Sequence, residues 1–202
     1  MRPMSQRSTA TPAHSPAPGA EQHPALDFAN SLLSLPTGPL DLIGSPETTT
    51  TWLIDHDLAP AGGRVYRPCT DRIHQLRTAI RALIEARAAD RPAPADALAA
   101  VNAALTATPS APLLHWDAER GLHRTLPHPA DRIADHAMAQ LAADAAELLT
   151  GPDADRLAAC GGTPCTRFFV RTHAARHWCS TRCGDRVRAA RAYAKKRAAN
   201  KG

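Results

Sequence analysis

Four cysteines near the C-terminal end of the 202-residue chain have the spacing of metal ligands. Cys160 and Cys165 form a C-x4-C pair, Cys179 and Cys183 form a C-x3-C pair, and thirteen residues separate the two pairs. Two closely spaced pairs can bring four thiolates to one tetrahedral Zn²⁺ ion. The spacing therefore predicts a zinc site. A four-thiolate shell favours a structural role over catalysis, with redox sensing as an alternative.

The residues around the cysteines predict a small finger that positions them. Glycines and a proline between the first two cysteines allow a tight knuckle around an ion. A strand at 168–170 is expected to pair with a second strand at 177–179, and Ser180 can cap a helix that begins near Thr181. Knuckle, hairpin and helix in this order give a treble-clef-like finger. Its own core is so small that we expect it to fold only with metal.

The charge of the chain changes sign at the finger. Residues 156–202 carry twelve Lys and Arg against one acid, a net of +11, whereas residues 1–155 carry twelve against eighteen acids, a net of −6. The final helix is cationic around most of its circumference. Its one apolar stripe, which we expect to pack against the finger, consists of Val187, Ala190 and Ala194.

A cationic helix on a zinc platform suits the phosphate backbone of double-stranded DNA and has the shape to enter the major groove. The candidate DNA contacts are Arg176, Arg182, Arg186, Arg188, Arg191 and Lys195. The alternative is a solvated helix without a partner. We favour DNA because the acids that would balance these cations are missing from this part of the chain.

Apolar periodicity predicts an α+β fold for the rest of the chain, with a mostly helical body and a small antiparallel sheet. The segment 23–35 suits either a helix or a strand. A β-hairpin is expected for residues 113–117 and 122–126, with Gly121 in its turn. The predicted helices are a short one after Ser45 and longer ones over 71–89 with Thr70 as the cap, 95–106 and 131–150.

Composition divides the chain into three parts. Residues 1–21 are rich in Pro, Ser, Thr and Ala without periodicity, which predicts a disordered tail. Residues 22–152 are the body, and residues 153–202 are the finger with its basic helix. No apolar run has the length of a membrane-spanning helix, and no signal-peptide core is present. We therefore expect a cytoplasmic, nucleoid-associated protein without membrane contact, in a reducing compartment.

His23, Asp27 and Asn30 lie within two turns of one another among apolar residues and could line a ligand pocket. The alternative is that the polar side chains only bond the backbone at an element boundary. Elsewhere, acids and histidines show no spacing that matches a hydrolytic triad, a Gly-rich phosphate loop or a His-x3-His zinc helix. We expect no enzymatic activity.

The stretch from Cys160 through CTRFFVRTHAARHWCSTRCGDRVRAARAYAKK resembles the CGNR zinc-finger family, whose Cys-Gly-Asn-Arg signature reads Cys-Gly-Asp-Arg at residues 183–186. The segments HPALDFANSLL and GPLDLIGSPETTTTWL resemble the start of the ABATE domain that usually precedes this finger. The resemblance implies a bacterial, stress-induced transcription regulator. It further implies an α/β ABATE domain that senses a ligand or stress, and a DNA-binding finger with zinc held by the four cysteines.

Asp185 departs from the signature asparagine. Because a carboxylate is repelled by phosphate but stabilised at a helix start, we expect Asp185 to cap the helix or to pair with Arg182 or Arg188.

Three functions follow from these patterns. The first is a DNA-binding regulator with a sensory body, which would take a small-molecule effector. The second is a zinc module that contacts protein or RNA, and the third is an enzyme that uses a pocket in the body. One helix contacts few base pairs, so a homodimer is expected to help, with helix 71–89 or 131–150 as its interface.

Overall fold

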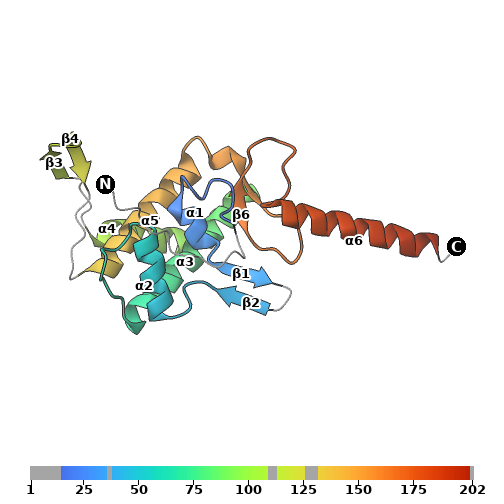
Figure 1. Ribbon diagram of the computed structural model, residues 1–202, viewed down its shortest axis with the longest axis horizontal. Coiled ribbons are helices and arrows are strands. Elements are labelled where there is room, and N and C mark those ends of the chain that lie inside the picture. Colours follow the sequence, from blue (N-terminus) through green and yellow to red (C-terminus); the bar gives the residue numbers. More distant parts are fainter. Residues whose placement is uncertain (1–14, 36–37, 109–112, 126–131, 201–202) are drawn as a thin grey trace, which may run out of the picture.

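The computed structural model describes residues 15–35, 38–108, 113–125 and 132–200. As predicted, the architecture is α+β, with a mostly helical body, small antiparallel sheets and a treble-clef-like finger that ends in a long helix (Figure 1). Three mutually packed helices form the centre of the body: α3 (Arg67–Ala88), α4 (Ala95–Ala107) and α5 (Ile133–Thr150). Within the described ranges, no helix has both the length and the apolar character to span a membrane.

The segment that suited both a helix and a strand contains one of each. Helix α1 (Pro24–Ala29) is followed by strand β1 (Leu32–Leu35), which pairs with β2 (Gly38–Asp41). The apolar side chains of α1 are fully buried against α5 and α3. Periodicity could not separate the two elements, because a short apolar run fits a buried helix and a strand equally well.

Helix α2 (Pro46–Asp55) begins as predicted, because the Ser45 side chain accepts a hydrogen bond from the backbone of Thr48. The predicted cap of α3 is wrong. The helix begins at Arg67, one turn before residue 71, and Thr70 lies inside it with its hydroxyl donating to the carbonyl of Tyr66. A proline at the second position of the helix suits the first turn, where its missing N–H costs nothing.

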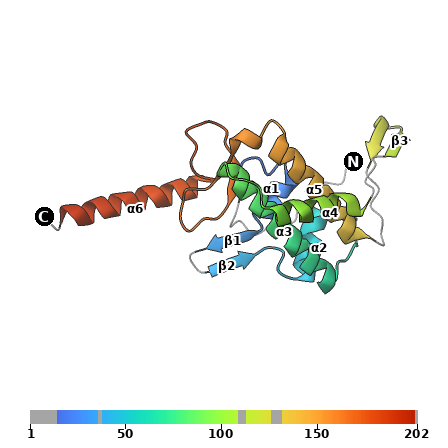
Figure 2. The same cartoon turned by 180° about the vertical axis from the view of Figure 1, so that it is seen from behind.

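Strands β3 (Leu113–Asp117) and β4 (Gly121–Thr125) form the predicted hairpin. The hairpin stands apart from the helices at the end of the molecule opposite the finger (Figures 1 and 2). One face carries three large apolar side chains that are about 70% exposed: Leu114 at 69%, Trp116 at 70% and Leu122 at 68%. The residues that flank the hairpin lie outside the described ranges.

The hairpin of the finger differs from the prediction. Strand β6 (Phe168–Val170) forms as expected, but it pairs with β5 (Leu157–Ala159), which follows a short 3₁₀ turn (Ala154–Arg156). Residues 177–179 are not a strand. The β5–β6 pairing is favoured because Leu157, Phe168 and Val170 join the core of the body, which buries more apolar surface than a hairpin within the finger could.

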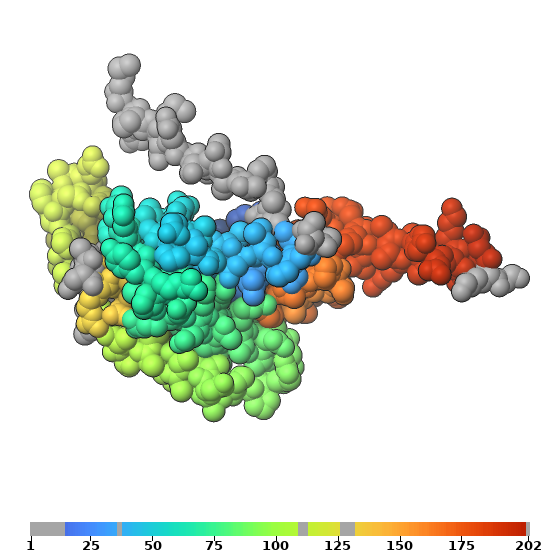
Figure 3. All heavy atoms as spheres, turned by 90° about the horizontal axis from the view of Figure 1, so that it is seen from below, coloured from blue at the N-terminus to red at the C-terminus, as the bar shows by residue number. Residues whose placement is uncertain are grey.

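Helix α6 (Thr181–Ala199) begins at the predicted Ser180 cap and projects away from the rest of the protein (Figure 3). At 1.5 Å per residue, its 19 residues span about 28 Å. The predicted packing of its apolar stripe is wrong. Ala190 and Ala194 are exposed and Val187 is only half-buried, because the finger contacts the first turns of α6 alone.

The predicted disordered tail is wrong for residues 15–21. This segment forms a turn that packs on the finger, with Ala17 completely buried. The buried alanine and Gly19, which has φ +93°, let the backbone approach β6 closely, so that the segment needs no large apolar side chain to be ordered. Residues 1–14 lie outside the described ranges.

Candidate metal centre and nucleic-acid interface

The four predicted ligands, Cys160, Cys165, Cys179 and Cys183, converge on one point. Their Sγ atoms all lie within 4.8 Å of one another, and the Sγ of Cys179 lies 3.7 Å from those of Cys165 and Cys183. Four thiolates bound about 2.3 Å from a Zn²⁺ ion would stand about 3.8 Å apart, whereas a disulfide requires about 2.05 Å. The donor set fits one tetrahedral ion and does not fit two disulfides. The nearby His173 and His177 do not belong to this cluster.

Thiols at this spacing cannot all ionise unless a cation lies among them. Hydrogen bonds from Cys165 and Cys179 lower the pKa of Cys160. Contact with Cys160 in turn raises the pKa of Cys165 to about 11 and also raises the pKa of Cys179. A divalent ion among the sulfurs would remove this repulsion and stabilise all four thiolates. The chemistry of the donor set therefore fits a bound metal ion.

The β5–β6 hairpin positions the first ligand pair. Strand β5 ends directly before Cys160 and β6 begins shortly after Cys165, so the hairpin sets the distance between these ligands. The backbone N–H of Cys160 donates to the carbonyl of Arg167 at 2.9 Å, and that of Cys165 donates to the carbonyl of Gly162 at 2.8 Å. These bonds close the predicted knuckle.

The start of α6 positions the second pair. The backbone N–H of Cys183 donates to the Ser180 hydroxyl at 3.3 Å, and that of Cys179 donates to the Sγ of Cys160 at 3.4 Å. Because Cys183 lies four residues after Cys179, in the first turn of the helix, both thiols reach the same side. Both residues are buried, so this side of the cluster is shielded from water.

The residues of the signature that do not bind metal have identifiable contacts. A Cβ on Gly184 would lie 3.1 Å from both the Trp178 ring and the Arg188 guanidinium, so glycine favours close packing of the ring on the first turn of α6. Asp185 accepts a hydrogen bond from Arg188 at 2.5 Å, which confirms that this acid pairs with a neighbouring arginine. The Arg188 guanidinium also lies over the Trp178 ring, 5.8 Å from its centroid.

Arg186 holds the knuckle. Its guanidinium donates to the carbonyls of Gly162 at 2.7 Å and Thr163 at 3.0 Å, and lies 3.5 Å from the Sγ of Cys183. Arg176 has a similar role at the second ligand pair, where it donates to the carbonyls of Trp178 and Cys179. Both were predicted DNA contacts, but these bonds direct their guanidinium groups into the finger.

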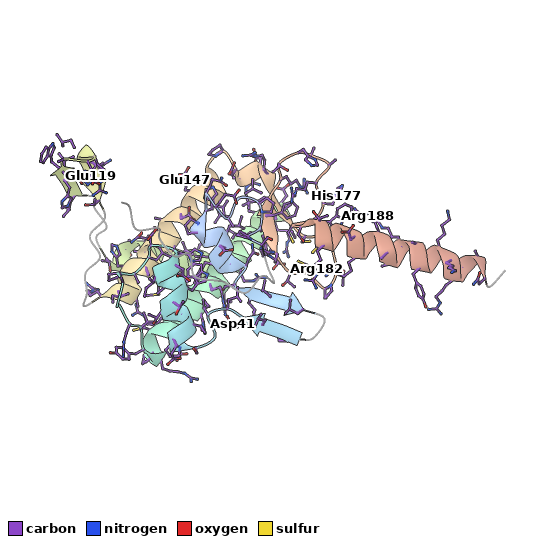
Figure 4. All side chains as sticks on the ribbon, viewed as in Figure 1. Asp41, Glu119, Glu147, His177, Arg182 and Arg188 are labelled. Carbon is purple, nitrogen blue, oxygen red and sulfur yellow. The ribbon has the colours of Figure 1, made fainter. Side chains whose placement is uncertain are left out.

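The remaining predicted DNA contacts project from α6. Arg182, Arg191 and Lys195 are exposed, as is Lys196, and none of the four forms an ion pair with the residues that the structure describes. Figure 4 shows Arg182 and Arg188 at the root of the helix. Arg188, Arg191 and Lys195 follow one another at three and four residues, so they lie on one face.

The side chains of His23, Asp27 and Asn30 have three different partners. His23 lies 2.9 Å from a carboxylate oxygen of Asp144 in α5, and Asp27 lies 3.0 Å from His56 at the end of α2. Asn30 instead bonds the backbone of Phe168 in β6, donating to its carbonyl at 2.9 Å and accepting from its N–H at 2.8 Å. The alternative interpretation, in which polar side chains bond the backbone at an element boundary, is confirmed for Asn30.

The pKa of His56 is raised by its surroundings. Burial is the largest single influence and lowers this pKa. The hydrogen bonds to Asp27 and to the Trp52 carbonyl, together with the charges of Asp27 and Asp55, raise the pKa by more than burial lowers it. The ring also stacks on Trp52, with 3.8 Å between the centroids. The ion pair of His56 with Asp27 therefore links α1 to α2 most strongly when His56 is protonated.

Two arginines on one face of α3 make contacts that were not predicted, and one of them, Arg81, connects the body to the finger. Arg81 donates to the carbonyls of Ala29 and Thr166, at 2.5 Å and 3.0 Å, and its guanidinium lies over the Phe168 ring. Arg77 donates both terminal N–H groups to Asp41 in β2, at 2.6 Å and 2.7 Å. The sequence signal that could have indicated these contacts is the four-residue spacing of the two arginines within an otherwise apolar helix face.

Comparison with protein families identifies both parts of the chain. Residues 22–152, which are more than half of the chain, match the ABATE family, described as "Putative stress-induced transcription regulator". Residues 156–196 match the CGNR zinc finger. A search of curated proteins found no match.

Proposed function

Because the chain belongs to the ABATE family and carries a CGNR zinc finger directly after that domain, we propose that it is a zinc-dependent regulator that binds double-stranded DNA through α6. The observation that carries this proposal is the exposure and positive charge of the outer part of α6. Every residue from 188 to 200 is exposed, and Arg191, Lys195 and Lys196 on this part of the helix form no ion pair with a described acid. An exposed helix of this kind contributes little to the fold, so its sequence is free to serve a partner.

Charge supports a polyanionic partner. Arg191 and Lys195 are four residues apart, and like charges at this spacing destabilise an isolated helix by a few tenths of a kcal/mol. After Asp185 no acid follows on the helix to relieve this repulsion. Phosphates would relieve it, and the release of their counterions would drive binding.

Shape supports duplex DNA over a flat acidic protein surface. The helix stands free on all sides, and the major groove of B-DNA, about 12 Å wide, admits a helix of this diameter. Arg188, Arg191 and Lys195 would face the phosphates of one strand, and Lys196 and Arg182 those on the other side of the helix. Arg186 and Arg176 would act from within the finger, by holding the root of α6 in place.

Zinc is the ion that best suits the site. Four thiolates at tetrahedral spacing are the usual structural zinc ligands, and they leave no open coordination position for a substrate. The metal would fix the root of α6 relative to the body. In this proposal the protein acts by binding, without catalysis.

The test removes two cations from the DNA-binding face. We expect Arg191→Gln/Lys195→Gln to reduce affinity for duplex DNA about tenfold or more at moderate salt, because each lost phosphate contact lowers the electrostatic term. The matched control is Arg64→Gln/Arg67→Gln, which removes the same charge from exposed positions on the body. Binding is measured by fluorescence anisotropy with genomic duplex fragments, after metal content is confirmed.

An equal loss of affinity in the two double variants would contradict the proposal, because the effect would then follow net charge and not α6. If single-stranded RNA competes better than duplex DNA, the target is RNA. If neither nucleic acid binds while a protein is retained by the same cations, the module is a protein contact.

The body would supply regulation, through an effector or through dimerisation. A groove of about 580 Å³ between the start of α2 and residues 62–67 has room for a small molecule. Helices α3 and α5 bury their apolar faces in the core, so a homodimer would use another surface. Such a regulator would act in the cytoplasm, on the nucleoid.

A further inference from the structure

The metal centre is built from both ends of the chain. Residues 15–21, here called the N-terminal strap, lie against the finger although about 140 residues separate them from the first ligand. Ala17 is completely buried in a small apolar cluster with Ala158, Phe169 and the ligands Cys179 and Cys183. Ala17 of the strap therefore belongs to the same buried apolar cluster as two of the four ligands.

The strap also completes the sheet that positions the ligands. One edge of β6 pairs with β5, and its other edge would be left open. On that edge the backbone N–H of Val170 donates to the carbonyl of Pro18 at 2.8 Å, while Phe168 exchanges two hydrogen bonds with the Asn30 side chain. Arg167, 7% exposed, donates to the carbonyl of Ser15 at 2.9 Å. Strap and Asn30 together take the place of a third strand.

The fit between strap and strand is close. A Cβ on Gly19 would lie only 2.5 Å from a methyl group of Val170, and the positive φ of this glycine also disfavours any other residue. The chain thus approaches β6 at van der Waals distance, which excludes water from this side of the hairpin.

We propose that the N-terminal strap holds the metal in the finger: the strap keeps the β5–β6 hairpin aligned and the buried ligands Cys179 and Cys183 covered, so that metal release requires the strap to detach. The finger, as bounded by residues 156–196, is therefore incomplete without residues 15–21. This inference concerns metal retention and does not depend on DNA binding.

The test measures zinc transfer from the full-length, zinc-loaded protein to the chromogenic chelator 4-(2-pyridylazo)resorcinol. Ala17→Asp places a carboxylate in the buried cluster, and we expect release to accelerate about tenfold or more, because an unpaired charge is costly to bury. Pro16→Asp is the matched control: it adds the same charge one residue away at an exposed position and should release zinc at the unchanged rate.

Gly19→Ala is a milder second variant that keeps the proposal testable if Ala17→Asp fails to fold. It should also accelerate release, by a smaller factor, because the added methyl pushes the strap from Val170. Unchanged release from Gly19→Ala and Ala17→Asp would overturn the proposal. So would faster release that appears only under conditions in which circular dichroism shows the body unfolding, because the metal would then be lost by global unfolding.

Discussion

Arg186 links the first turn of α6 to the knuckle of the metal centre. Its place in a cationic helix made it a candidate phosphate contact, yet its guanidinium spans two carbonyls of the knuckle and lies near a ligand sulfur. The ligands themselves could be predicted, because cysteine spacing reflects the geometry of one ion. The partner of an arginine could not, because a long side chain with five donors reaches many acceptors that only the fold brings close.

Removal of the Arg186 side chain should weaken the metal centre. We expect Arg186→Ala to lose metal several-fold faster than the wild type during dialysis against a chelator, since two carbonyls of the knuckle lose their donor. Arg182→Ala is the control on the neighbouring turn, with no such contacts, and should retain metal as the wild type does. Equal retention in the two variants, measured as metal per protein, would show that Arg186 does not hold the knuckle.

Asn30 should contribute strongly to the stability of the fold through its two hydrogen bonds with the backbone of Phe168. Asn30→Ala leaves the buried N–H and carbonyl of Phe168 without partners, which should lower the free energy of unfolding by about 2–4 kcal/mol. The control is Ser34→Ala, which removes an exposed hydrogen bond between the hydroxyls of Ser34 and Thr166. It should change the free energy of unfolding by less than about 0.5 kcal/mol. Urea unfolding compares the two, and similar effects would contradict the role of Asn30.

At the scale of elements, the helices and the β3–β4 hairpin could be predicted because their patterns are local. Strand β6 was also predicted, but its partner was not. The expected strand at 177–179 lies closer to the cysteines, whereas the true partner β5 is selected by burial of Leu157 against the body. The order in residues 15–21 escaped prediction for the same reason, since the bonds that hold this short Pro- and Ala-rich segment on the finger come from the distant residues Arg167 and Val170.

The contact between α1 and α2 should depend on pH. A raised pKa means that the folded state favours protonated His56, so its stabilising effect is complete below the ordinary value of 6.5 and is lost as pH rises through the folded pKa. Between about pH 6 and pH 8, the wild type should therefore lose more stability than His56→Gln. Urea unfolding across this range is the measurement, and parallel curves for the two proteins would contradict the assigned pair with Asp27.

Metal removal should affect the elements unequally. Because β5 and β6 share the core of the body, we expect a chelator to disorder the segments around the cysteines and the root of α6 while α1 to α5 remain folded. Far-ultraviolet circular dichroism should show that most of the helical signal is retained. The tryptophan fluorescence should change, because Trp178 packs beside the ligands. Complete unfolding on chelation would instead support a chain that folds only with metal.

At the scale of the whole molecule, two exposed elements lie at opposite ends of one packed unit (Figures 1 and 3). The β3–β4 hairpin carries an exposed apolar face and α6 carries exposed cations. Body and finger share one core, so the division at residue 153 does not correspond to two independent folding units. The sequence indicated the change of charge between the two parts but not their common core, because long-range packing leaves no periodic pattern.

If α6 binds DNA through phosphate contacts, the affinity for duplex DNA should depend steeply on salt concentration. For the wild type, the logarithm of the binding constant should fall steeply and linearly with the logarithm of salt concentration, by about 0.9 per phosphate contacted. In Arg191→Gln/Lys195→Gln the slope should be smaller by about 2. A shallow wild-type slope, or a slope that this double variant leaves unchanged, would show that α6 does not bind DNA through phosphate contacts.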